Sequence, residues 1–251
     1  MNTVVLTNNN SLYGKKLIQQ FEKSGIPLAG IIIINQPLSY NVKLFGYVKR
    51  RVGLIQAFYF AIKAVFMGIL RKTEKIKYSD FNTKSFTVKG NNSTELEQLL
   101  LKLDVDVIVL AQTGIIRNNI IKKAKKGVLN AHPGILPDYR GIDCLKWAIL
   151  NNDLSKIGCT VHWVDQGVDT GNIISTHQYK IKLNLSFDEL EWDLYLQCIN
   201  ELVKAVSMLE NGEPIKSTPQ AKDKGKQYYK MPLSKEILAN KLLRKLSHDV
   251  T

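Results

Sequence analysis

Residues 127–141 read Gly-Val-Leu-Asn-Ala-His-Pro-Gly-Ile-Leu-Pro-Asp-Tyr-Arg-Gly, an apolar run that ends in a dense polar cluster. The run is typical of a short buried strand. Because side chains alternate along a strand, Asn130 and His132 should point to the same side. A second cluster, Asp165-Gln166-Gly167-Val168-Asp169-Thr170-Gly171, follows later in the chain. These two clusters hold the densest chemistry of the sequence.

Similar apolar runs occur earlier in the chain, at residues 4–6, 31–34 and 105–110. Helical patterns separate them, notably at 12–21, 95–102 and 118–125. Strands that alternate with helices predict an α/β fold with a doubly wound, mostly parallel, Rossmann-like sheet. Such sheets bind ligands beyond the carboxyl ends of their strands, which is where residues 8–11 and 130–132 should lie.

The second half of the chain changes character. Strands are predicted at 157–164 and 172–181, and a long helix at 186–208, with Ser186 as its N-cap. A final helix is predicted at 234–246, packed back on the domain. We expect residues 1–210 to form one catalytic domain, with a basic, apolar helical insertion at 43–75. Residues 211–251 should form a C-terminal extension.

The composition limits the class of protein. The chain has 251 residues, of which 45% are hydrophobic, enough for a substantial core. The three cysteines are far apart in sequence, so we expect neither a disulfide framework nor a metal site. The N-terminus lacks the pattern of a signal peptide, which together with the cysteines favours the cytoplasm. The net charge of +13 suits nucleic acid, an anionic membrane or a phosphorylated substrate, but a solvated lysine-rich surface explains it equally well.

One segment does not follow the strand–helix pattern. Residues 53–70 are apolar apart from Gln56 and Lys63, and basic residues flank them on both sides. The length just reaches that of a transmembrane helix, but Lys63 near the centre argues against spanning. We expect a buried helix or an interface between copies of the chain. The alternative is a basic amphipathic helix that contacts a membrane surface through residues 49–72.

The polar clusters contain a set of groups suited to acyl transfer. The Asn130 amide can donate to a developing oxyanion, and His132 can exchange a proton near neutral pH. Asp169 can support the histidine and help to remove a proton. No Ser or Cys lies in either cluster, so the nucleophile should be an amine of the substrate. The alternative for each cluster alone is an ordinary turn shaped by proline and glycine.

Asn-x-His followed by Leu-Pro and Tyr-Arg-Gly, and then Asp-x-Gly-x-Asp-Thr-Gly, resembles the 10-formyltetrahydrofolate-dependent formyltransferase family. The resemblance covers roughly residues 3–210 and is strongest at 105–175. It implies that Asn130, His132 and Asp169 are the catalytic residues and that 10-formyltetrahydrofolate is the co-substrate, without a metal. It also implies a folate pocket, whose residues would be Gly114, Ile115, Ile116, Asp165, Gln166, Gly167 and Val168. Relatives often have Ser-Leu-Leu-Pro where this chain has residues 133–137, a departure that removes no catalytic group.

The acceptor amine is less clearly indicated. Tyr139-Arg140-Gly141 resembles the tRNA and sugar branches of the family, and residues 215–251 are too few for the C-terminal barrel usual in the tRNA branch. The insertion and Trp147-Ala148 are similar to sugar enzymes. We therefore expect a nucleotide-linked amino sugar of the kind that feeds O-antigen, lipopolysaccharide or other surface polysaccharides.

Four further residues are candidates for binding this substrate. Asn10 and Ser11 could hold a phosphate with the following helix N-terminus. Tyr139 and Arg140 could contact the sugar nucleotide, although Arg140 could equally brace the nearby turn. The alternatives are a methionyl-tRNA formyltransferase, a glycinamide ribonucleotide formyltransferase, and a non-enzymatic RNA- or membrane-binding module. We expect no nucleic-acid partner, and we leave a homo-oligomer open.

Overall fold

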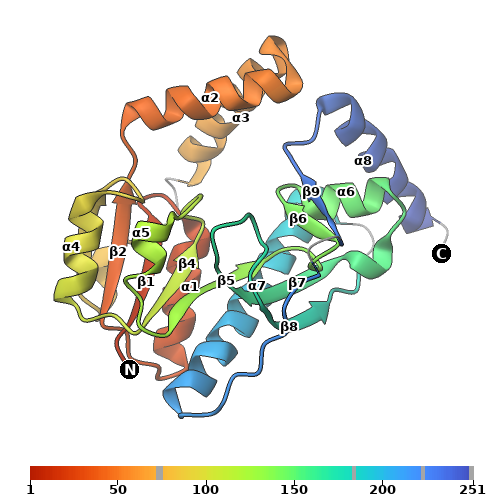
Figure 1. Ribbon diagram of the computed structural model, residues 1–251. Coiled ribbons are helices and arrows are strands. Elements are labelled where there is room, and N and C mark those ends of the chain that lie inside the picture. The colour runs from red at the N-terminus through yellow and green to blue at the C-terminus, as the bar shows by residue number, and fades with distance from the viewer. Residues whose placement is uncertain (72–75, 183–184, 222–223, 249–251) are drawn as a thin grey trace.

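The computed structural model describes residues 1–71, 76–182, 185–221 and 224–248, and its core is a seven-stranded sheet with the order β3-β2-β1-β4-β5-β7-β8 (Figure 1). The strands are β1 (Thr3–Asn8), β2 (Gly30–Asn35), β3 (Ser85–Lys89), β4 (Val107–Ala111), β5 (Gly127–His132), β7 (Gly158–Trp163) and β8 (Ile173–Gln178). The first five strands are parallel, and β7 and β8 are antiparallel to their neighbours. The predicted mostly parallel α/β sheet is therefore confirmed.

Helices cover both faces of the sheet, because the central strands are apolar on both sides. Val5 and Val109 face a cluster that contains Leu17 and Phe21 of α1 (Leu12–Lys23) and residues of α7 (Phe187–Glu210). Leu6 and Ile108 face the opposite cluster, with α4 (Thr94–Lys102) and α5 (Asn118–Ile121). Alternate residues of one strand thus fill different cores, as a doubly wound sheet requires.

The C-terminal segment is joined to the centre of the chain by a small second sheet. β6 (Tyr139–Gly141) pairs in parallel with β9 (Lys226–Tyr228), and the rings of Tyr139 and Tyr228 stack with centroids 4.8 Å apart. Beside this sheet, α6 (Cys144–Leu150) packs on α8 (Leu233–His248) (Figure 1). The predicted final helix therefore does pack back on the molecule.

Three sequence predictions differ from the structure. The helix predicted at 118–125 ends at Ile121, and turns follow it. β3 was not predicted, because it is a short edge strand in which Val88 is the one buried residue and Phe86 is only partly buried. The structure also contains two short 3₁₀ helices, Tyr78–Asp80 and Leu154–Lys156.

The third difference concerns the apolar insertion, which forms two successive helices, α2 (Leu38–Val52) and α3 (Leu54–Arg71) (Figure 1). α3 is not buried within the chain, because Ile55 and Ile62 are 85% and 68% exposed. The expected alternatives of an interface between copies and of a membrane-surface helix stay predictions. Lys72 and Lys75, which belong to the predicted insertion, lie outside the described residues. Within the described ranges, no helix is long and apolar enough to cross a membrane.

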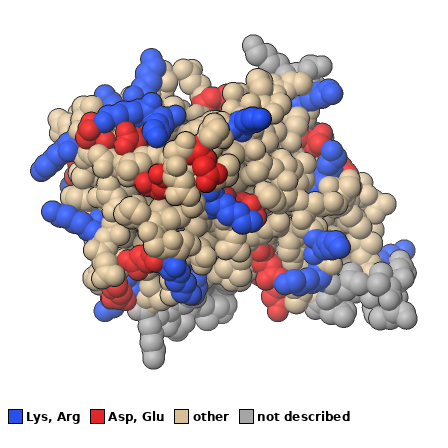
Figure 2. Space-filling model, turned by 90° about the horizontal axis from the view of Figure 1, so that it is seen from below, with Lys and Arg blue, Asp and Glu red and all other residues tan. Residues whose placement is uncertain are grey.

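The surface charge is dispersed on the face that Figure 2 shows. Lys and Arg side chains alternate there with Asp, Glu and uncharged residues, and no continuous basic surface forms on this face. On this face, therefore, the positive charge of the chain is interspersed with negative and uncharged side chains.

Candidate active site

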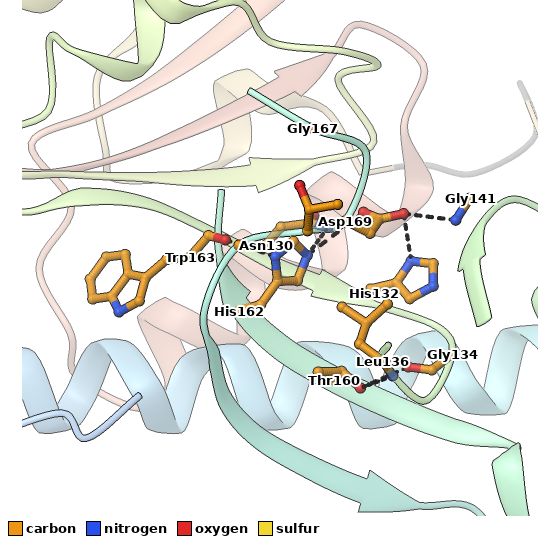
Figure 3. A network of polar contacts seen from close by, with 12 residues as sticks. Asn130, His132, Gly134, Leu136, Gly141, Thr160, His162, Trp163, Gly167 and Asp169 are labelled. Carbon is orange, nitrogen blue, oxygen red and sulfur yellow. Dashed lines mark hydrogen bonds and ion pairs between the residues drawn. The ribbon is translucent and has the colours of Figure 1, made fainter. Parts of the chain in front are cut away.

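Asn130, His132 and Asp169, the three predicted catalytic residues, come together at the carboxyl end of β5 (Figure 3). Asn130 and His132 lie on the same side of the strand because they are two residues apart. Asp169 reaches them from the loop after β7, where its φ of 54° turns the chain sharply. All three side chains line a pocket of about 510 Å³.

His132 is held between two protein oxygens. Its Nε2 atom lies 2.7 Å from the carbonyl oxygen of Tyr139, and its Nδ1 atom lies 3.4 Å from Asp169 Oδ2. The same carboxylate oxygen accepts a hydrogen bond from the backbone N–H of Gly141 at 2.9 Å. A doubly protonated ring would therefore donate to both oxygens and place a positive charge beside the pocket.

A second histidine, His162, also belongs to the site, and it was not identified from the sequence. Its Nδ1 atom lies 2.8 Å from the carbonyl oxygen of Trp163 and must donate there, which leaves Nε2 as an acceptor. The Asn130 Nδ2 atom lies 3.2 Å from this Nε2 atom. Burial lowers the pKa of His162 below its ordinary value, although Asp169 opposes the shift. His162 therefore suits a neutral acceptor that orients the Asn130 amide.

The loop that carries Asp169 is held in place by hydrogen bonds within the loop and by one from Gln220. Asp165 Oδ1 accepts from the backbone N–H of Gly167 at 3.0 Å and from Thr170 Oγ1 at 2.6 Å. Gln220 Nε2 donates to the carbonyl oxygen of Asp169 at 3.0 Å. These contacts fix the backbone on both sides of the carboxylate, so its position beside His132 is set in advance.

The turn between His132 and β6 is braced by Thr160 of β7. Thr160 Oγ1 donates to the carbonyl oxygen of Gly134 at 2.8 Å and accepts from the backbone N–H of Leu136 at 3.1 Å (Figure 3). The turn carries Tyr139 into the position where its carbonyl oxygen meets His132. The unusual sequence at 133–137 is thus tied to the placement of the imidazole.

Six of the seven residues predicted to contact folate line the pocket, namely Gly114, Ile115, Ile116, Asp165, Gly167 and Val168. Gln166 is exposed and does not line it. Ile115 is 69% exposed, although the amides of Asn91 and Asn92 hold its carbonyl oxygen at 3.1 and 2.9 Å. An exposed apolar side chain on a backbone fixed by hydrogen bonds, at the lining of a pocket, fits the binding of a planar aromatic group.

The four residues predicted to bind the acceptor do not line this pocket. Ser11 Oγ accepts from Gly14 N as the N-cap of α1 and donates to Gln112 Oε1 at 3.0 Å. Tyr139 is buried, and its hydroxyl contacts Asp153 and Asn151. Arg140 donates to the carbonyl oxygen of Lys224 at 3.0 Å, and Asn10 is exposed. Ser11, Tyr139 and Arg140 therefore stabilise the surroundings of the pocket rather than its lining.

Other residues also line the pocket, and the sequence analysis missed them. Asp143, Glu191, Tyr195 and Lys230 line the pocket. Lys230 Nζ lies 3.0 Å from Asp143 Oδ2, and burial raises the pKa of Glu191 above its ordinary value. These residues come from three separate segments of the chain, because Glu191 and Tyr195 both belong to α7. Only the tertiary structure brings them together.

A cysteine also lies beside the imidazole, although neither sequence cluster contains one. Cys144 Sγ is 3.5 Å from His132 Nε2. Burial raises the pKa of the Cys144 thiol well above its ordinary value, and the charges of Asp169 and Asp143 raise it further. The thiol is therefore held in its protonated, weakly nucleophilic form.

A parallel α/β sheet with an amide, an imidazole and a carboxylate around one pocket defines a group-transfer enzyme site. The chain belongs to the formyl transferase family, whose model matches residues 1–206. The matched region ends within α7 and so includes all three predicted catalytic residues.

Two curated relatives and one solved structure illustrate the family. The methionyl-tRNA formyltransferase of Orientia tsutsugamushi is 31% identical over 150 residues, which are 59% of this chain and 48% of the relative. The GDP-perosamine N-formyltransferase of Brucella melitensis is 29% identical over 130 residues, 51% of this chain and 50% of that protein. The chain thus spans about half the length of the curated relatives it matches.

The N-formyltransferase from Helicobacter canadensis, solved with folinic acid and dTDP-3-aminofucose, superposes with a TM-score of 0.60 at 15% identity. The superposition covers 97% of this chain and 81% of that one. At this identity the likeness shows a shared fold.

Proposed function

We propose that this protein transfers a formyl group from 10-formyltetrahydrofolate to the amino group of a nucleotide-linked sugar. The observation that carries the proposal is the convergence of Asn130, His132 and Asp169 on one pocket, with His162 orienting the amide. Asn130 suits an oxyanion donor, Asp169 suits a proton acceptor, and His132 holds the carboxylate of Asp169 in place.

When bound, 10-formyltetrahydrofolate supplies an electrophilic formyl carbonyl. Asn130 Nδ2 has two hydrogens, and because one is directed to His162 Nε2, the other is free for the carbonyl oxygen. Both nitrogens of His132 face protein oxygens, so from this position the ring holds Asp169 rather than donating into the pocket.

Asp169 is the group that we propose accepts the proton of the attacking amine. Its Oδ2 atom is engaged by Gly141 N and faces His132, while Oδ1 lies 3.7 Å from His162 Nε2. The acceptor loses one proton to solvent and attacks as the neutral amine. The new C–N bond forms by addition to the formyl carbon, and the bond from that carbon to the folate nitrogen then breaks. The second proton of the amine passes through Asp169 to the folate nitrogen. Electrons and protons balance without a protein nucleophile.

The charge of the pocket supports a small cationic amine as the acceptor. Asp143, Asp165, Asp169 and Glu191 line it, whereas Lys230 is the one lysine or arginine among its described lining residues. Carboxylates attract a protonated amine and repel a polyanion. The net positive charge of the chain is therefore not concentrated in the lining of this pocket, and the nucleotide would extend beyond it.

The choice of an amino sugar rests on this charge and on the similarity to the Brucella enzyme. The methionyl-tRNA formyltransferase relative makes charged initiator tRNA the second candidate. The decisive assay supplies 10-formyltetrahydrofolate with a panel of amino-sugar nucleotides, glycinamide ribonucleotide or charged initiator tRNA. Tetrahydrofolate release and the mass of the formylated product are measured.

We expect a formylated amino-sugar nucleotide to appear with the wild type and to be strongly reduced with Asn130→Ala. If only tRNA or glycinamide ribonucleotide were formylated, the proposed amino-sugar acceptor would be wrong, but the proposed formyl transfer would still hold. No turnover with any amine would overturn both.

A further inference from the structure

α3 carries an apolar stripe on its exposed side. Ile55, Phe58, Ile62 and Val65 are 85%, 53%, 68% and 64% exposed. Their spacing of three and four residues places them on one face of the helix. Such a contiguous exposed apolar surface on a folded protein marks an interaction site.

The other side of α3 is already packed. Ala57 is buried, and Gln56 Oε1 accepts a hydrogen bond from the backbone N–H of Leu233 at 2.9 Å. Lys230 Nζ lies 4.8 Å from the centroid of the Phe60 ring. These contacts hold α3 against Lys230 and the first residue of α8, so α3 is already packed on the molecule through its other side.

The positive charge of α2 and α3 indicates which kind of partner can bind the apolar stripe of α3. Residues 38–71 contain six cationic residues, Lys43, Lys49, Arg50, Arg51, Lys63 and Arg71, and no Asp or Glu. Lys49, Arg50 and Arg51 are exposed in the last turn of α2, directly before the stripe begins. A second copy of the chain would bring a surface of the same sign against this one, and like charges oppose such an association.

We propose that the α2–α3 pair docks on an anionic lipid bilayer. An exposed apolar helix face beside a cluster of exposed cations is the combination that binds in the interface of an anionic membrane. The apolar side chains of α3 would enter the boundary between head groups and acyl chains, and the cations at the end of α2 would meet the lipid phosphates. The pair lies against Lys230, which also lines the candidate active site, so docking would bring the pocket close to the membrane.

The test is co-sedimentation of the full chain with phospholipid vesicles and requires no formyl-transfer activity. We expect the protein to pellet with vesicles of phosphatidylcholine that contain phosphatidylglycerol and to stay in solution with phosphatidylcholine alone. Added salt should weaken the binding, because it screens exposed charges. The outcome is independent of the acceptor amine, so it stands or falls separately from the proposed function.

Two variants of the α2–α3 pair and one matched control separate the contributions of charge and of apolar surface to vesicle binding. Lys49→Gln with Arg50→Gln should weaken binding about 30-fold, the factor that corresponds to about 2 kcal/mol for two cations near an anionic surface. Ile55→Ser with Ile62→Ser removes apolar surface without changing charge, and should weaken binding at least about tenfold. The control, Leu101→Ser with Lys102→Gln, makes the same kinds of change at exposed positions of α4 and should bind as the wild type does.

Circular dichroism would show that the variants remain folded, and sedimentation velocity would report self-association. Equal binding to both kinds of vesicle, no binding to either, or an equal loss in the α4 control would overturn the proposal. So would a wild-type dimer that becomes monomeric in Ile55→Ser with Ile62→Ser and binds no vesicle, since the stripe would then be an interface between copies.

Discussion

His162 Nε2 lies 3.2 Å from the side-chain nitrogen of Asn130, and the register of the sheet places the two residues directly opposite each other on β7 and β5. Opposed residues in antiparallel strands have neighbouring side chains. Because the other ring nitrogen donates to the carbonyl oxygen of Trp163, the ring can accept from the amide only while it is neutral. The orientation of the proposed oxyanion donor thus depends on a residue outside both sequence motifs.

Replacing His162 by Phe should reduce kcat about tenfold with little change in the KM for the folate substrate, because losing a hydrogen bond that orients Asn130 costs about 1–1.5 kcal/mol. Steady-state kinetics of the single and double variants measures this. In an Asn130→Ala background the same change should have almost no further effect. Additive losses in the double variant would show that His162 acts independently of Asn130.

The stability of the protein should decrease as the pH falls below about 6.5, the ordinary pKa of histidine, and His162 should account for part of the loss. Burial lowers its pKa in the folded state, so the unfolded chain binds the proton more readily at acid pH. Where the unfolded state binds more protons, stability rises with pH. Urea denaturation from pH 7.5 to pH 5 should therefore show a weaker pH dependence for His162→Phe than for the wild type. Identical slopes would contradict a buried neutral His162.

Cys144→Ala should retain most of the kcat, although the thiol lies 3.5 Å from His132 Nε2. A thiol whose pKa is raised by burial is a weak nucleophile, and direct attack by the amine does not require it. Turnover of the variant and mass spectrometry of the wild type mixed with 10-formyltetrahydrofolate alone would measure this. A formylated enzyme, or loss of activity in the variant, would indicate a covalent route through Cys144.

Gly141→Ala should destabilise the protein by about 1–3 kcal/mol, because a side chain is strained at a positive φ. The φ of Gly141 is 96°, and a Cβ atom there would collide with the carbonyl oxygen of Tyr228 in the paired strand. The substitution should also lower kcat, since Gly141 N–H donates to Asp169. Urea denaturation gives the free energy of unfolding.

A matched control for Gly141→Ala is Gly46→Ala in α2, where a Cβ would meet nothing within 4 Å. It should be neutral or stabilise by about 0.5–1 kcal/mol, as expected for alanine in a helix interior. Equal destabilisation by both substitutions would contradict a specific role for the β6–β9 pairing.

The sequence was informative where a local pattern and a tertiary requirement coincide. β1, β2, β4 and β5 are largely buried on both faces, and each contains a run of consecutive apolar residues. Asn130, His132 and Asp169 lie in short motifs, and they could be proposed from residue types alone.

Other parts of the fold and site depend on long-range contacts that no local pattern reveals. A histidine within the apolar strand β7 has the pattern of an ordinary core residue, and only the register opposite Asn130 gives His162 its place. β6 and β9 are each three residues long and become strands by pairing across more than 80 positions. The apolar composition of α3 predicted burial, but packing on the 229–233 segment leaves one of its faces in solvent.

The most direct measurement is kcat for formyl transfer by Asn130→Ala and Asp169→Asn, at saturating 10-formyltetrahydrofolate and acceptor amine. We expect kcat to fall about 10²–10³-fold in Asn130→Ala, the usual cost of losing one oxyanion donor. Asp169→Asn should also be severely impaired, with folate binding preserved in both variants. Near wild-type kcat in either variant would contradict the assignment of these residues to the reaction.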